Sequence, residues 1–179
     1  MNKKLNNSLK ETRIERDVWP LTVRITHWLV AVFVLTNFVN DTGYWHRIIG
    51  YVCLILIAIR IIHAAKTKIA HARLFWPTSH AILQHLKEIS SGVVTEHAGH
   101  NPLGQLAVYG MWLLIALLGF TGWLSRTDAY WGEDWPVDLH NYLSDALMLM
   151  VLLHLLAIVI ISKLQKQNLV KRMIAEKSN

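Results

Sequence analysis

The chain has 179 residues, of which 53% are hydrophobic and only 17% are charged, and its formal net charge is +6. An average soluble domain has roughly 25% charged residues, so the composition argues against a disordered protein, a coiled coil and a soluble enzyme of this size. The single cysteine, Cys53, excludes a disulfide framework, a cysteine-based zinc cluster and covalent attachment of a cofactor through a Cys-x-x-Cys-His motif.

Four stretches are long and apolar enough to cross a bilayer as helices. A hydrocarbon core about 30 Å thick requires roughly 20 mostly apolar residues in helical conformation. Each stretch is apolar around its whole circumference, which favours lipid surroundings over the core of a soluble protein. We therefore predict an all-α integral membrane protein, with residues 1–179 forming one domain. The predicted spans are residues 21–40, 44–64, 102–125 and 138–162.

The basic residues indicate how these spans are oriented. Sixteen of the eighteen lysines and arginines lie in three segments, residues 3–24, 60–87 and 163–177. The other two, Arg47 and Arg126, lie near connections that are otherwise acidic. Because connections rich in lysine and arginine stay in the cytoplasm, we expect an up-down-up-down bundle with both termini cytoplasmic. The positive charge then faces a membrane surface, and no nucleic-acid partner is expected.

The connections between the spans differ in length. Asn-Asp-Thr-Gly at 40–43 is typical of a tight turn, which makes the first two spans hairpin partners. Residues 65–101 form a long cytoplasmic connection, in which Thr78 is a suitable helix cap. Two interpretations of the following helix stay open. It lies flat on the membrane with its apolar stripe buried, or it is a solvated loop helix.

Four histidines lie within the predicted spans: His27, His46, His140 and His154. Ionisable residues are costly inside a membrane and usually mark a functional site. His140 and His154 are 14 residues apart, which places them within about 40° of one helix face and separates them by about 21 Å along the axis. His27 is expected at the depth of His154, near the cytoplasm, and His46 at the depth of His140. The sequence thus predicts two histidine pairs at two depths.

Facing imidazoles in a helical bundle are the ligand set of a six-coordinate haem b. Two such haems would provide an electron path across most of the membrane. A zinc site would need three or four ligands at one depth, and a proton relay would need carboxylates at the membrane centre. Histidines that are merely hydrogen-bonded within the bundle remain the structural alternative.

Other residues fit this interpretation less specifically. Gly50 follows His46 by one turn and leaves room for a macrocycle. Arg24 and Arg60 lie towards the cytoplasmic end, where they could pair with the propionates of the inner haem. Arginines that reach out to the lipid surface explain the same two positions equally well.

His100, together with His97, lies just before the third span. These side chains are candidates for a quinone head-group site or for a contact with a propionate. The alternative is a simple helix start, with Asn101 as the cap and Pro102 at the first helical position.

Several of these stretches resemble the bacterial cytochrome b561 family and, within it, the branch of nickel–iron hydrogenase b-type cytochrome subunits. Together they cover nearly the whole chain, and Pro20 stands where the family often has an acid after the tryptophan. The matching pieces are Val-Arg-Ile-Thr-His-Trp-Leu at 23–29, His-Arg-Ile-Ile-Gly-Tyr at 46–51, Gly-His-Asn-Pro-Leu-Gly at 99–104, Gly-Phe-Thr-Gly-Trp at 119–123, Asp-Leu-His at 138–140 and Asn-Leu-Val-Lys-Arg-Met-Ile at 168–174.

The resemblance implies a multi-pass protein of the bacterial inner membrane that binds two haems b through His27, His46, His140 and His154. It also implies electron exchange between membrane quinone and a partner, which differs among family members: a hydrogenase, a periplasmic c-type cytochrome or superoxide. The chain is shorter than typical hydrogenase subunits, which favours a periplasmic c-type cytochrome.

The acidic outer connection, which contains Glu133, Asp134 and Asp138, would suit a basic redox partner, although solubility and topology explain these acids equally well. No catalytic constellation is found, so the chain is expected to be an electron-transfer protein or an oxidoreductase subunit. Two alternatives stay open: a stand-alone superoxide:quinone oxidoreductase and a haem-free membrane anchor.

Overall fold

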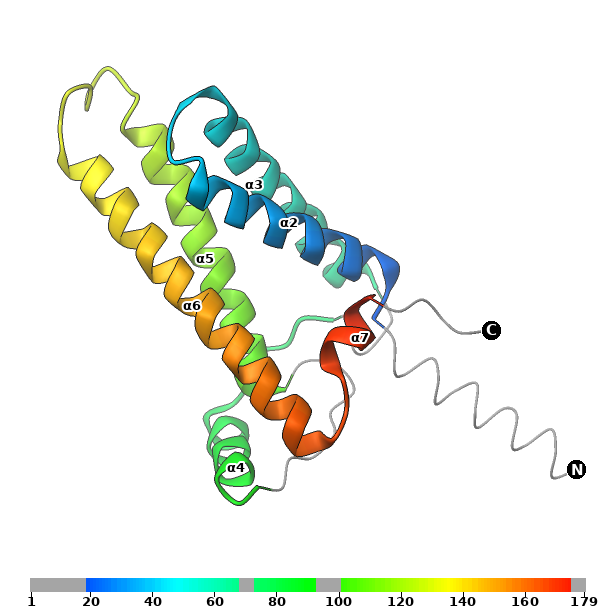
Figure 1. Cartoon of the computed structure of the whole chain (residues 1–179). Coiled ribbons are helices and arrows are strands. Elements are labelled where there is room, and N and C mark those ends of the chain that lie inside the picture. Colours follow the sequence, from blue (N-terminus) through cyan, green and yellow to red (C-terminus); the bar gives the residue numbers. More distant parts are fainter. Residues whose placement is uncertain (1–18, 68–72, 93–100, 175–179) are drawn as a thin grey trace, which may run out of the picture.

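The computed structural model describes residues 19–67, 73–92 and 101–174, and every regular element within these ranges is a helix. Figure 1 shows their arrangement. The helices are α2 (Leu21–Val39), α3 (Gly43–Lys66), α4 (Ser79–Ser90), α5 (Pro102–Leu124), α6 (Trp135–Gln165) and α7 (Leu169–Ile174).

Helices α2, α3, α5 and α6 are long and apolar enough to cross a membrane, which confirms the prediction of an all-α protein with four such helices. Helix α6 extends beyond the predicted 138–162 at both ends. It begins at Trp135 because Pro136 is compatible with the first helical turn. It ends after Gln165 because Lys166 adopts the left-handed conformation, with φ 53°.

The four long helices form two hairpins, α2 with α3 and α5 with α6, and α3 packs against α5 (Figure 1). The turn between α2 and α3 needs Gly43, whose φ of +97° is rarely adopted by other residues. We call the end of the bundle that holds residues 40–42 and 125–134 the turn end. The other end, where α2 and α5 begin and α3 and α6 finish, is the terminal end. Which of these ends faces the cytoplasm stays a prediction.

The buried core of the bundle is small. Its centre is formed by Cys53 and Ile57 of α3, Ile115 of α5 and Leu147 of α6. At most 22% of the most apolar window of any long helix is buried inside the protein. The remaining apolar side chains point outward, where lipid tails can cover them.

Helix α4 lies near the terminal end and contacts α5 (Figure 1). Its N-terminus has the predicted cap, because Oγ1 of Thr78 accepts a hydrogen bond from the backbone N–H of Ala81 at 3.3 Å. Helix α7 returns to the start of α2, where Nε1 of Trp28 donates to the carbonyl oxygen of Met173 at 3.1 Å. That α4 lies flat on the membrane stays a prediction.

Candidate functional site

The first histidine pair lies at the turn end and joins α3 to α6. The ring centroids of His46 and His140 are 5.9 Å apart, and the ring planes are inclined by 61°. Nδ1 of His46 lies 2.7 Å from the carbonyl oxygen of Asn40. A carbonyl oxygen only accepts, so the proton is on Nδ1 and the lone pair of Nε2 is available to a metal ion.

His140 is held in the same way, by a side chain of α5. Its Nδ1 lies 3.0 Å from Oγ1 of Thr121, which is only 2% exposed. The Thr121 hydroxyl donates to the carbonyl oxygen of Leu117 at 2.9 Å, so its lone pairs accept the proton of His140 Nδ1. This arrangement again leaves Nε2 available. A Cβ atom at Gly122 would lie 3.3 Å from Cε1 of His140, so the glycine allows the imidazole to lie close to α5.

The backbone beside this pair is tied to α2 by an amide side chain. Nδ2 of Asn37 donates to the carbonyl oxygen of His46 at 2.8 Å. A Cβ atom at Gly50 would lie 3.6 Å from the same Nδ2. Gly50 therefore faces Asn37 across the α2–α3 contact, and its predicted role of making room for a macrocycle stays a prediction.

The second pair lies towards the terminal end and joins α2 to α6. The ring centroids of His27 and His154 are 6.3 Å apart, with ring planes inclined by 55°. Within the described part of the chain, neither imidazole takes part in a hydrogen bond. His154 follows His140 by 14 residues, so the two pairs are separated by about 21 Å along α6.

The spacing within each pair suits two ligands on opposite sides of one metal ion. Metal–nitrogen bonds of about 2 Å and an imidazole radius of about 1 Å place the centroids of two such rings about 6 Å apart. Both observed separations are close to this value. Among the residues that the structure describes, no three His, Cys, Asp or Glu side chains gather into a metal cluster. The donor set is thus two imidazoles at each of two depths, which fits two haems b.

Arg60 lies at the level of the second pair. It follows His46 in α3 by 14 residues, just as His154 follows His140 in α6. Arg60 is only 6% exposed, so its side chain lies inside the bundle and does not extend along the lipid surface. Arg24, by contrast, donates through Nη2 to the carbonyl oxygen of Ile174 in α7.

Gln105 was not predicted, although it is the most deeply buried polar residue described in the bundle. It is 0% exposed, and neither atom of its amide group has a hydrogen-bond partner within residues 19–67, 73–92 and 101–174. It lies 16 residues before Thr121 in α5, which places it about 24 Å towards the terminal end, near the level of His154. Burying an unpaired amide costs about 1–3 kcal/mol, so a polar group at this level would stabilise the site.

Two features of the sequence could have drawn attention to Gln105 and Thr121. Gln105 is the single amide side chain in the third span, and Thr121 belongs to the Gly-Phe-Thr-Gly-Trp stretch. Their contacts depend on how α5 is rotated against α6, which the sequence pattern does not specify. The predicted His100 lies outside the described residues, as does His97.

The fold and these two pairs define a class: a four-helix membrane protein that presents two imidazole couples, one towards each end of the bundle. The family model described as prokaryotic cytochrome b561 matches residues 18–176, and the chain belongs to this family. Searches among curated proteins and among solved structures found no match.

The family assignment confirms the resemblance to the bacterial cytochrome b561 family. The hydrogenase branch stays a prediction. The chain is therefore a bacterial multi-pass membrane protein whose family supports electron transport with b-type haem.

Proposed function

We propose that this protein transfers electrons across the bacterial inner membrane through two haems b, between the quinone pool and a redox partner in the periplasm. The observation that carries the proposal is the presence of two imidazole pairs, each with metal-ligand spacing, 14 residues apart along α6. Haem iron supplies reversible one-electron oxidation and reduction. The protein would supply the histidine ligands, the apolar surroundings and the nearby polar groups.

At the turn end, His46 and His140 would bind one haem through Nε2. Their Nδ1 protons are held by the Asn40 carbonyl oxygen and the Thr121 hydroxyl. Hydrogen bonds of this kind fix the ring orientation and make the imidazole a stronger electron donor to the metal. A stronger donor favours oxidised iron, so these two contacts would lower the reduction potential of a haem bound at the turn end.

At the terminal end, His27 and His154 would bind the second haem. The positive charge of Arg60 lies at the same level and is suited to a propionate, with Arg24 as a second candidate. Gln105 offers one donor and one acceptor group in a dry environment. A quinone head group near this haem would satisfy the amide, which supports electron exchange with quinone at this end.

The periplasmic partner would bind at the turn end. The connection between α5 and α6 exposes Asp128, Glu133 and Asp134, and such a surface attracts a basic protein by electrostatic steering. A c-type cytochrome fits this requirement, and we favour it over a hydrogenase subunit. On this proposal the turn end faces the periplasm and both termini lie in the cytoplasm.

Electron transfer across a sealed vesicle tests the proposal. The full-length protein is reconstituted with reduced quinone in the bilayer, and ferricyanide, which does not cross it, is added outside. We expect ferricyanide to be reduced through the wild-type protein. His27→Ala should reduce the rate to that of protein-free vesicles, because the terminal-end ligand pair is broken, whereas His80→Ala, at an exposed position of α4, should leave it unchanged. An undiminished rate in His27→Ala would contradict the two-haem path.

Replacing Thr121 tests the proposed tuning of the turn-end haem. In Thr121→Val the shape of the side chain is nearly kept, but Nδ1 of His140 loses the hydroxyl group as an acceptor. We expect turn-end haem affinity to fall by about 10- to 100-fold, the usual effect of removing a ligand's hydrogen-bond partner. The reduction potential of the remaining turn-end haem should rise, as measured by a spectroscopic redox titration. Thr121→Ser should restore both values, and an unchanged potential in Thr121→Val would refute the role of the hydroxyl.

A further inference from the structure

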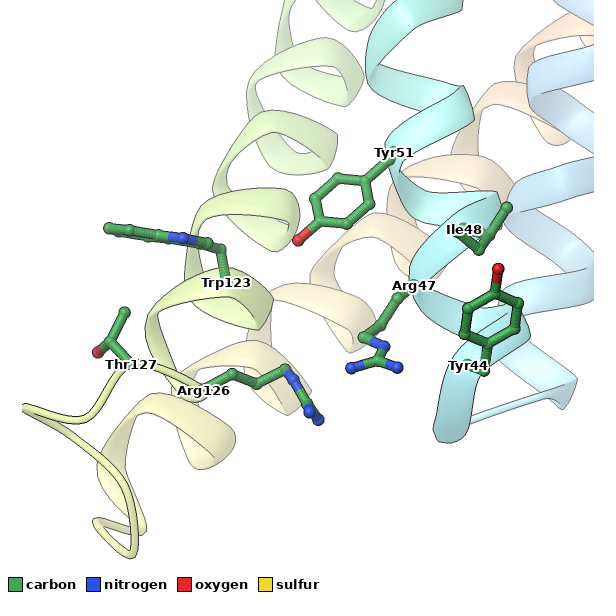
Figure 2. A pocket seen from close by; sticks show the side chains of 7 residues that line it. All are labelled: Tyr44, Arg47, Ile48, Tyr51, Trp123, Arg126 and Thr127. Carbon is green, nitrogen blue, oxygen red and sulfur yellow. The ribbon is translucent and has the colours of Figure 1, made fainter.

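A recess lies at the turn end, between α3 and α5. Its volume is about 250 Å³. Figure 2 shows its lining, with the guanidinium groups of Arg47 and Arg126 in the space between the two helices. The lining residues are Tyr44, Arg47, Ile48, Tyr51, Trp123, Arg126 and Thr127. We call this recess the arginine pocket.

The two arginines bring positive charge to a pocket whose lining residues include no acidic side chain. Arg47 comes from the first turns of α3 and Arg126 from just beyond α5. Neither guanidinium takes part in an ion pair or a hydrogen bond within the described ranges, and Arg47 lies 5.9 Å from the centroid of the Tyr44 ring. Two like charges facing one recess are stabilised by a shared anion.

The arginine pocket faces away from the histidine pair at the same end. The four lining residues of α3 span an arc of about 100° whose centre lies roughly 150° from the direction of His46. Tyr44 and Trp123 are 61% and 52% exposed, so the pocket opens onto the outer surface of the bundle. A haem between His46 and His140 would lie on the other side of α3, so its propionates are not the anion that the pocket would accept.

The lining combines a cationic rim with an apolar wall. Tyrosine and tryptophan at the end of a membrane span are typical of the depth of the lipid head groups. Ile48 and Trp123 offer apolar surface beside the arginines, and further along the same two helices Leu54 of α3 packs closely against Gly119 of α5. The planar guanidinium group matches two phosphate oxygens at once. The pocket is therefore suited to a phosphate group that is attached to an acyl chain.

We propose that the arginine pocket binds the phosphate of an anionic phospholipid, with Arg47 and Arg126 as the two charged contacts. The lipid holds the turn-end segments of α3 and α5 together, and its acyl chain runs along Ile48 and Trp123. The proposal is independent of haem ligation and of the side of the membrane to which the turn end belongs.

Native mass spectrometry of the full-length protein in a neutral detergent tests the proposal. Phosphatidylglycerol and phosphatidylcholine of equal chain length are added separately, and bound lipid is counted. We expect the wild type to bind phosphatidylglycerol roughly tenfold more tightly than phosphatidylcholine, and Arg47→Gln/Arg126→Gln to lose this preference, since a hydrogen bond to a charged group contributes about a tenfold change in affinity. The matched control, Arg73→Gln/Lys87→Gln, removes two exposed charges outside the pocket and should keep the preference.

A single variant and a competition with inorganic phosphate complete the test of the arginine pocket. Arg126→Gln alone changes an exposed side chain and should lower the preference even if the double variant does not fold. Inorganic phosphate at millimolar concentration should not displace phosphatidylglycerol from the wild type; displacement would mean a site for a free anion and would overturn the lipid proposal. Equal binding of the two lipids by the wild type, or an unchanged preference in Arg126→Gln, would also overturn it.

Discussion

Haem content should fall from two per chain to one when either member of the terminal-end pair is replaced, in His27→Ala or in His154→Ala. Each of these imidazoles is one of two facing ligands, with ring centroids 6.3 Å apart. A haem that loses one axial ligand in an apolar site loses much of its binding free energy. The turn-end haem should remain, because its ligands lie about 21 Å away along α6. Haem per protein is measured from the visible spectrum of the alkaline pyridine complex.

Double replacements separate the two pairs more sharply than single ones do. His27→Ala/His154→Ala removes both ligands of one proposed haem, so its haem content should equal that of either single variant. His27→Ala/His140→Ala removes one ligand from each pair and should leave no bound haem. The two double variants should differ because His27 and His154 share one site, whereas His27 and His140 belong to different sites. The effects of replacing residues that share a site do not add up. His80→Ala, outside both pairs, should retain two haems.

Three outcomes would contradict the proposed pairing of the histidines or point to unfolding of a variant. Retention of two haems in both single variants would show that the terminal-end pair is not a ligand set. Loss of both haems in His154→Ala alone would indicate that the protein no longer folds, and thermal unfolding of the same sample distinguishes this case from a local loss. One haem left in His27→Ala/His140→Ala would show that the ligands are paired differently.

The depths of the four histidines could be predicted because they depend only on residue spacing along a helix and on the direction of each helix. The 14-residue spacing in α6 fixes both a common face and a separation, and the short turn at 40–42 makes α2 and α3 run in opposite directions. These two facts place His27 at the depth of His154 and His46 at the depth of His140 without any knowledge of side-chain packing. Whether these side chains bind haem stays a prediction, although the family assignment supports it.

The polar partners of the histidines could not be predicted in the same way. Thr121 reaches His140 only because α5 is rotated so that Thr121 and Gly122 face α6. Each long helix is apolar almost all round, so periodicity gives little information about its rotation. The burial of Gln105 depends on the same rotation. The contact between α3 and α5 could not be predicted from the sequence either, because the long connection of residues 65–101 does not specify which helices are neighbours.

A bulky side chain at Gly119 should separate α3 from α5 and destabilise the bundle. A Cβ atom at this position would lie 2.6 Å from Cδ1 and 3.3 Å from Cγ of Leu54, closer than carbon atoms pack. We expect Gly119→Leu to lower the free energy of unfolding by about 1–3 kcal/mol, the usual effect of overpacking a filled interior. Thermal unfolding in detergent measures the change, and Ala116→Leu, at an exposed position of the same helix, should have little effect.

A second change at Leu54 tests whether this contact is the cause. Leu54→Ala leaves a gap beside Gly119, so Gly119→Leu/Leu54→Ala restores side-chain volume at the same place. The double variant should therefore be less destabilised than the sum of the two single variants. If the changes in unfolding free energy of the two single variants simply added up, the contact between residue 119 and Leu54 would not be the cause of the Gly119→Leu effect. Because Arg47 and Arg126 lie on the same two helix ends, we also expect Gly119→Leu to weaken binding of phosphatidylglycerol, and the double variant to recover it.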